Sequence, residues 1–299
     1  MKKWETDAIP GHLHFPIFFY RKDTAMLVTI QQTKSNIENL FEVSSNGQLL
    51  FQAKAPWMKI SLPFNAEDLR ELTFSNPAGE IVYTTRYKFI DNLVEESIPF
   101  KYLLTKGQRF GQFEIIGRNG SEGAFYVMQN GLFDSKFCIE CSGKVYLGYS
   151  LDKGRNNYVS IYDGVKQIAQ ITKPLTVTDN LDVYFFHIKD EYASIIPVLS
   201  FFTVYYDYRK YNHSGELTKN TVQISNSYTY GKNNDKYNPN WIAKEFGQQA
   251  ADELEQKLRK IRAQGSAQAK KIVKLVGLAY LVLILLAIVL FVVLKSTLG

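Results

Sequence analysis

Between Ile17 and about Ile188, short runs of apolar and polar residues alternate with turn signals at close spacing. Runs such as 80–89 and 113–116 are rich in aromatic and β-branched residues, which suit a pleated, half-buried strand. Four dipeptides that favour tight hairpin turns separate such runs: Asn46-Gly47, Asn119-Gly120, Asn130-Gly131 and Asp163-Gly164. No long amphipathic helix precedes residue 190. The pattern predicts a mainly β fold, either a sandwich or a barrel.

A different pattern follows, because the segment from Tyr192 to Tyr206 carries no charge and is apolar on every face. As a helix it would span about 22 Å, which is short for a bilayer. A helix that is apolar all round must be surrounded by other protein. We therefore expect a central helix buried inside a β-barrel, with Ile195, Ile196, Leu199 and Phe202 among its core residues.

Residues 212–240 are rich in Asn, Ser, Thr, Tyr, Lys and Gly, and they predict a polar linker with one strand at Thr221 to Ser225. A basic helical neck is expected over 239–271, with Asn238-Pro239 at its start and an interruption at Gly265-Ser266. Its first helix, to about Ala263, carries a thin apolar stripe: Ile242, Phe246, Ala250, Leu254, Leu258 and Ile261. The stripe leaves open whether this helix lies on a membrane, packs on the barrel or pairs with a second copy.

The most apolar segment of the chain runs from Leu275 to Leu294, twenty residues without a charge between Lys274 and Lys295. Sixteen of the twenty are Leu, Ile, Val or Phe. As a helix the segment spans roughly 30 Å, the thickness of the hydrocarbon core of a bilayer. We predict one transmembrane helix, and the five residues that follow it indicate a tail-anchor layout.

The formal net charge of +6 is compatible with a mildly basic surface, with binding to nucleic acid or with an anionic membrane, and the position of the charges favours the membrane. Seven cations lie in the eighteen residues before the predicted span, with no acidic residue among them: Lys257, Arg259, Lys260, Arg262, Lys270, Lys271 and Lys274. We expect them to contact anionic phospholipid at about 1 kcal/mol each. The alternative is that they only set the topology of the anchor.

The same cations predict orientation, because basic residues beside a span stay in the cytoplasm. Residues 1–11 contain no apolar segment of a secretory signal. We therefore expect a single-pass protein of the cell membrane with its N-terminal domain in the cytoplasm. The expected partners are anionic phospholipid and a protein or second copy bound through the helix before the anchor, and no nucleic acid is expected.

A faint repeat divides 13–211 into two similar halves, about 13–97 and 98–211, each a hairpin, a loop and a hairpin. Together with the apolar segment that ends in Tyr205-Tyr206-Asp207, this arrangement resembles the tubby-like superfamily, which includes the tubby C-terminal domain, LURP-one-related proteins and phospholipid scramblases. The motifs that carry the resemblance are 137–146, 157–164 and 166–171. It implies a twelve-stranded barrel closed around its own C-terminal helix, with lipid binding, membrane association or lipid scrambling, and no catalytic residues or cofactor to carry over.

Other candidate chemistry is sparse. Cys138 and Cys141 are three residues apart, so on one strand they would face opposite sides and could not share a metal or a disulfide. The glycine-rich segment 117–123 lacks the ending of a phosphate loop and is expected to be a hairpin turn. Four cations are candidate lipid contacts on the barrel itself: Lys101, Lys106, Arg109 and Arg118.

Three functions remain in view. The first is a non-enzymatic, membrane-tethered tubby-like module that binds anionic phospholipid or a protein partner. The second is scramblase-like lipid transfer between leaflets, which the basic segment after Asp207 disfavours, because scramblases of this superfamily carry an acidic calcium segment there. The third is an enzyme that uses the barrel interior, which a buried central helix would fill.

Overall fold

A computed structural model describes residues 26–35, 38–56, 71–87, 108–129, 135–211 and 221–298, with side chains as far as Ala287 in the last helix. Twelve strands form the main body of the molecule: β1 (Met26–Ser35), β2 (Glu38–Ser45), β3 (Gln48–Pro56), β4 (Thr73–Ser75), β5 (Ile81–Tyr87), β6 (Gln108–Gly117), β7 (Gly120–Gln129), β8 (Ser135–Cys141), β9 (Lys144–Gly154), β10 (Asn156–Asp163), β11 (Lys166–Pro174) and β13 (Val183–Ile188).

These twelve strands close into an antiparallel barrel. From β1 to β11 each strand pairs with the next one along the chain, β13 lies between β11 and β1, and the pairing of β9 with β10 completes the ring. At the closing strand, Phe186 is opposite both Val28 of β1 and Ile171 of β11. Closure leaves no unpaired barrel edge among the described strands. The predicted mainly β fold is confirmed, and it is a barrel.

The barrel has two distinct ends. Tight hairpin turns lie at one of them, which we call the turn end, and there Asn46 and Gly47 take the positive φ values of 51° and 77° that such turns require. The Asp163-Gly164 and Ser142-Gly143 turns lie there too. The other end carries the β9–β10 turn at Gly154 and the turn that contains Asp179, and we call it the Asp179 end. The Asn130-Gly131 turn lies outside the described residues.

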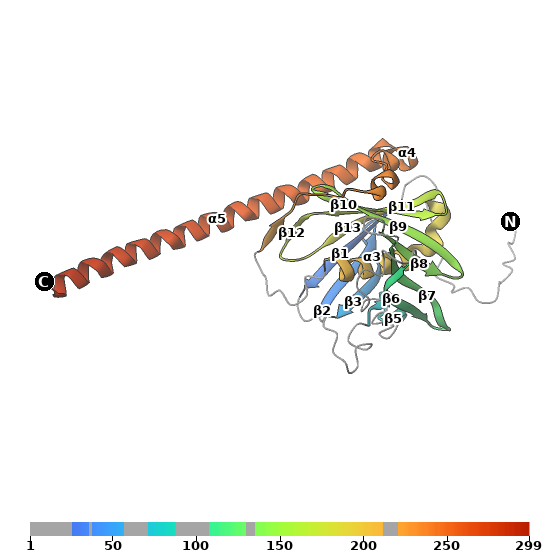
Figure 1. Cartoon of the computed structure of the whole chain (residues 1–299), viewed down its shortest axis with the longest axis horizontal. Helices are drawn as coiled ribbons and strands as arrows, with labels where there is room; N and C mark the ends of the chain where they lie inside the picture. Colours follow the sequence, from blue (N-terminus) through green and yellow to red (C-terminus); the bar gives the residue numbers. More distant parts are fainter. Residues whose placement is uncertain are drawn as a thin grey trace.

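A helix fills the barrel. A 3-10 helix, η2 (Asp190–Ile195), leads into α3 (Ile196–Lys210), which runs from the turn end to the Asp179 end (Figure 1). Every residue of α3 from Ile196 to Tyr208 is buried, including Leu199 and Phe202. Pro197 lies in the first turn of the helix, where its missing N–H costs nothing. The predicted central helix is confirmed, although Ile195 belongs to η2 and is only partly buried.

Aromatic rings form much of this core. The ring of Phe201 lies 5.3 Å from that of Phe74 and 5.6 Å from that of Phe125, and the Phe202 ring lies 5.8 Å from that of Phe137. These partners come from β4 and from the neighbouring strands β7 and β8, so α3 contacts more than one part of the ring. Each such side chain contributes about 1.5–3 kcal/mol by leaving water. The interior is therefore a packed core.

The described part of the predicted linker lies on the barrel instead of spanning free solvent. β14 (Val222–Ile224) pairs with β12 (Thr176–Thr178), β15 (Ser227–Tyr228) pairs with the end of β9, and a 3-10 helix, η3 (Lys232–Lys236), follows. The expected strand at 221–225 is confirmed as β14. Side chains of 221–240 contact the barrel: Ser227 Oγ donates a hydrogen bond to Asp152, and Asn233 Nδ2 donates one to the carbonyl of Ser150. Residues 212–220 lie outside the described residues.

The neck differs from its prediction in where it breaks. A short helix, α4 (Trp241–Phe246), ends at Gly247, whose φ is 88°, and α5 (Gln248–Leu298) then continues without interruption. The helix begins two residues after the start expected at about Pro239, whereas the expected break at Gly265 is wrong. Gly265 is buried against the barrel, and a Cβ atom there would collide with Cγ2 of Thr176. This glycine lets two elements approach closely and does not end the helix.

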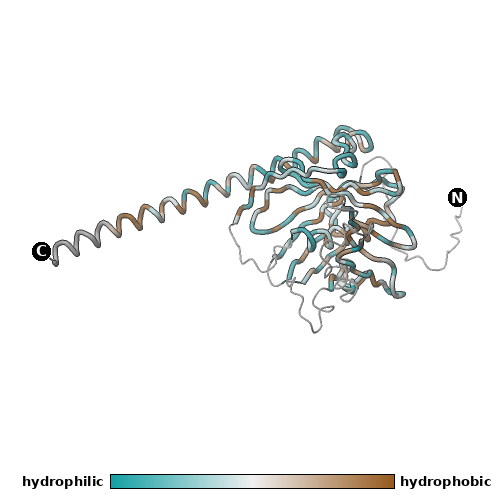
Figure 2. The backbone as a smooth tube through the Cα atoms, in the orientation of Figure 1, coloured by the Kyte–Doolittle hydropathy of each residue, from teal (hydrophilic) through white to brown (hydrophobic). Residues whose placement is uncertain are grey.

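α5 leaves the barrel beyond β12 and extends well past it, with its apolar part at the far end (Figures 1 and 2). The predicted span 275–294 lies within α5, but the side chains of 288–294 lie outside the described residues. Among the residues that are described, no helix combines the length and the apolar character needed to cross a membrane.

Candidate functional site

The first part of the neck packs on the outer wall of the barrel. The side chains of Leu254 and Leu258 on α5 and of Trp241 and Ile242 on α4 are buried against Phe185, which points outward from β13. Leu27, Phe246, Ala250 and Ile261 pack around this cluster. All six residues of the predicted apolar stripe therefore belong to one contact with the barrel. Of the three locations that the sequence left open for this helix, the structure shows packing on the barrel.

His187 lies buried beneath this contact, with only 1% of its surface exposed. Its ring lies 5.7 Å from that of Phe246, and its Nδ1 has no hydrogen-bond partner among the described residues. Burial, and secondly the charge of Lys257, lower the pKa of His187 to about 4. A neutral histidine is thus sealed between the barrel and the neck. Its position depends on the tertiary packing, and no motif in the sequence indicated it.

The seven predicted lipid-contact cations fall into two groups. Lys257, Arg259, Lys260 and Arg262 lie on the part of α5 that packs on the barrel. Arg259 pairs with Glu255 of the same helix, and two of the others contact the barrel itself. The Lys257 ammonium lies 5.7 Å from the centre of the Phe185 ring. The Arg262 guanidinium lies 3.3 Å from Glu255 Oε1 and donates a 3.2 Å hydrogen bond to Asn156 Oδ1 on the barrel. These contacts join the helix to the barrel.

The second group, Lys270, Lys271 and Lys274, lies beyond the barrel. All three side chains are exposed, and within the described part of the chain no acidic side chain pairs with them. An exposed apolar stretch follows directly, and Leu275 and Leu286 are 69% and 59% exposed. The structure therefore places a cluster of free cations next to a helical stretch whose apolar side chains have no protein cover.

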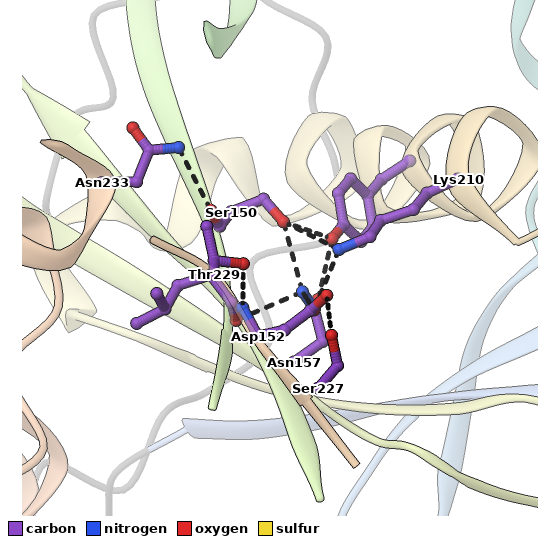
Figure 3. Close-up of polar contacts among 9 residues, drawn as sticks. Ser150, Asp152, Asn157, Lys210, Ser227, Thr229 and Asn233 are labelled. Carbon is purple, nitrogen blue, oxygen red and sulfur yellow. Dashed lines mark hydrogen bonds and ion pairs between the residues drawn. The ribbon is translucent and has the colours of Figure 1, made fainter. Parts of the chain in front are cut away.

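At the Asp179 end, a polar network links α3, β9, β10 and the segment around β15 (Figure 3). The Lys210 ammonium lies 3.0 Å from Asp152 Oδ1, which also accepts a 2.6 Å hydrogen bond from Asn157 Nδ2. Ser227 Oγ donates to the other carboxylate oxygen of Asp152. Burial by itself would raise the pKa of Asp152, but Lys210 and these hydrogen bonds outweigh it and lower the pKa. Lys210, which belongs to the basic segment after Asp207, is therefore paired.

A second ionic network is buried deeper at the same end. The Lys173 ammonium lies 2.6 Å from Asp182 Oδ1, and each of these side chains is 1% exposed. Tyr184 donates a 2.6 Å hydrogen bond to Asp207 Oδ1 at the end of α3. Burial, followed by the nearby charge of Asp182, raises the pKa of Asp207 well above its ordinary value. Removing one partner from such a network leaves an uncompensated buried charge, so these residues hold the end of α3 in place.

The two cysteines face opposite sides of β8, as expected. Cys138 packs outside the barrel against Ala124 and Tyr126, and Cys141 belongs to the interior core. Burial raises the pKa of both thiols, which disfavours the reactive thiolate. In the part of the chain that the structure covers, no three His, Cys, Asp or Glu side chains are close enough to hold a metal ion.

Of the four cations proposed on the barrel, the two that the structure describes lie at opposite ends of β6. Arg109 lies over the Tyr126 ring at 4.5 Å, and Arg118 lies 3.4 Å from Glu80 Oε2. Lys101 and Lys106 lie outside the described residues. The segment 117–123 contains the two-residue turn between β6 and β7 at Arg118 and Asn119, which confirms the predicted hairpin.

No protein-family model matches this chain, and neither a curated protein nor a solved structure matches it.

Proposed function

We propose that this chain is a membrane-tethered, non-enzymatic β-barrel of tubby-like kind that binds anionic phospholipid at the cytoplasmic face of the cell membrane. In this proposal 275–294 is the transmembrane helix. Lys270, Lys271 and Lys274 are the principal lipid contacts, because they are free of protein partners among the described residues. The cations nearer the barrel contribute mainly to docking.

One observation carries the proposal: the exposed part of α5 presents three free cations followed by thirteen uncharged residues, 275–287, and the uncharged sequence continues to Leu294. Apolar side chains at the centre of a span favour insertion by about 0.3–0.6 kcal/mol each. Cations beside an anionic leaflet add about 1 kcal/mol each. An anionic lipid bilayer accommodates both features, because its headgroups attract the cations and its hydrocarbon core takes up the apolar segment that follows them.

The filled barrel supports a binding role over catalysis or lipid transfer. The side chains of α3 occupy the interior from Ile196 to Tyr208, so lipid transfer or chemistry inside the barrel would require this helix to leave. The ionic networks at Lys173 and Lys210 hold its end. Scramblase-like transfer therefore has less support than binding.

The anchor is tested by placing charges in the predicted span. In the full chain, Leu281→Asp combined with Leu285→Asp should move the protein from the carbonate-washed membrane fraction to the soluble fraction, because each acid costs roughly 2.5–3.5 kcal/mol near the centre of a span. The matched control, Leu281→Ala with Leu285→Ala, should remain in the membrane fraction. A wild-type chain that washes off the membrane would overturn the proposal.

The lipid contact is tested on the detergent-purified full chain. Changing Lys270, Lys271 and Lys274 to Gln should reduce the anionic phospholipid that co-purifies with the protein, relative to neutral lipid. The matched variant changes Lys257, Arg259 and Lys260 to Gln and should retain more of it. An equal loss in both variants, or none in either, would contradict the assignment.

A further inference from the structure

α5 runs along the outside of the barrel, and residues farther along the helix contact parts of the barrel nearer its Asp179 end. Lys257 lies over Phe185, Arg262 bonds to Asn156, and Gln268 Nε2 donates a 3.1 Å hydrogen bond to Asp179 Oδ1. Each residue advances the helix by about 1.5 Å, so the eleven residues from 257 to 268 cover roughly 16 Å. Along this path α5 runs from the level of Phe185 on β13 toward the Asp179 end of the barrel.

The exit point is closely packed. Gly265 lies against Thr176 of β12, where a Cβ atom would collide, and an ideal Cβ there would lie 3.7 Å from Cγ1 of Val222 on β14. Three residues later Gln268 reaches Asp179, whose backbone N–H donates a 2.8 Å bond to the carbonyl of Thr221. Because α5 has no break at this point, the barrel and the free part of the helix are joined without a hinge.

The separation between the barrel and the uncharged segment is short. From Gln268 to Leu275 there are seven residues, or about 10 Å of helix. The headgroup layer on each side of a bilayer is roughly 5–8 Å thick. If Leu275 enters the hydrocarbon, the turn that contains Asp179 and the start of β14 lie close to the headgroups, whereas the turn end lies on the far side of the barrel.

We propose that the Asp179 end of the barrel is a membrane-facing surface that contacts anionic phospholipid headgroups, with Thr221 and Asp179 among its closest described residues. This inference rests on the proposed function and adds to it the orientation of the barrel. Lys270 and Lys271 follow Gln268 within one helical turn, so α5 carries cations between its contact with Asp179 and the uncharged segment. The free cations and this end of the barrel then form one continuous lipid-binding face.

The test compares one position at each end of the same wall. The full chain carrying Thr221→Cys or Val165→Cys is labelled with a fluorophore and reconstituted in vesicles that contain anionic lipid and a headgroup-attached quencher. Val165 lies in the β10–β11 turn at the turn end and is 97% exposed. We expect strong loss of fluorescence at position 221 and little at position 165. The wild-type chain controls for labelling of Cys138 and Cys141, which are both buried.

A second pair of variants tests whether the close packing at the exit sets the orientation. Gly265→Leu should separate α5 from β12 and reduce the difference in quenching between positions 221 and 165. Gly277→Leu is the matched control, because nothing lies within 4 Å of a Cβ atom at Gly277, and it should leave the difference unchanged.

The outcomes separate the orientation from the proposed function. Equal quenching at both positions, in chains that remain with the vesicles after carbonate washing, would overturn the orientation and leave the anchor intact. A chain that does not remain with the vesicles would overturn the proposed function and the orientation with it.

Discussion

α5 consists of two parts in contrasting environments. From Gln248 to Gln268 it packs on the barrel, with Leu254 and Leu258 buried and Arg262 paired. Beyond Gln268 the same helix has exposed side chains on nearly every face, first cationic and then apolar. Both parts are helical and both carry cations, so neither helix formation nor the presence of cations distinguishes them. The difference lies in the partner, which is the barrel for the first part and, in our proposal, lipid for the second.

The largest contrast is expected from leucines in the two parts. Leu258→Ala should weaken docking of the neck by about 2–5 kcal/mol, because it removes a buried side chain from a packed cluster. Leu278→Ala should change the same free energy by no more than about 0.5 kcal/mol, since Leu278 is 64% exposed. Hydrogen exchange of the backbone amides at 250–260, in detergent-solubilised full chain, measures both. Similar changes in the two variants would mean that the parts are not distinct.

Acidic pH should loosen only the packed part. The pKa of His187 is lowered from 6.5 to about 4, so the unfolded or undocked chain binds the proton more readily than the packed one. The contribution of neutral His187 to the stability of the docked neck is therefore complete above pH 6.5. It declines as the pH falls toward 4, by roughly 3 kcal/mol in total. Lys257, Lys189 and Glu245 are the charged groups that face this contact or border it.

The measurement is hydrogen exchange of α4 and the first turns of α5 between pH 7 and pH 4, corrected for the intrinsic rate. In His187→Gln the loss of protection on acidification should largely disappear. Residues 269–287 contain no His, Asp or Glu, so the free part supplies an internal reference that should not respond. An unchanged pH response in His187→Gln would assign the effect to another group.

The smallest expected effects come from single cations, one in the packed part of α5 and one in the free part. Arg262→Ala should weaken docking by about 1 kcal/mol, because it removes a hydrogen bond to Asn156 and a partly exposed ion pair with Glu255. It should leave the amount of co-purified anionic lipid nearly unchanged. Lys274→Ala should do the opposite, with no change in docking and about 1 kcal/mol less attraction to an anionic surface. Both variants are measured by hydrogen exchange of the neck and by analysis of the co-purified lipid. A variant that changes both docking and bound lipid would contradict the assignment of Arg262 to docking and Lys274 to lipid.

Much of the fold could be predicted from local sequence. Asn46-Gly47 and Ser142-Gly143 form tight turns with positive φ, because these residue types tolerate that backbone conformation. The uncharged segment from Tyr192 to Tyr206 predicted a surrounded helix, and its part from Ile196 onward fills the barrel. The barrel itself was an expectation that the structure confirms, whereas the tubby-like resemblance remains a proposal.

The candidate site was less predictable, because its interactions join residues far apart in the chain. Lys210 belongs to the basic segment after Asp207, and nothing in that segment indicates that Asp152 of β9 is its partner. Gly265 looked like a helix break, and only Thr176 on the barrel explains why a glycine is needed within a continuous helix. In both cases the decisive atom lies dozens of residues away, where local patterns carry no information.

The sequence by itself determined which segments must leave water and which can turn, because burial and backbone freedom are properties of individual side chains. It also determined the cluster of cations followed by twenty uncharged residues at the end of the chain. Only the tertiary structure decided which of those cations are bound to the barrel and which remain free. That choice depends on where the helix leaves the barrel, and the packing of Gly265 and Gln268 against β12 and the Asp179 turn sets this point.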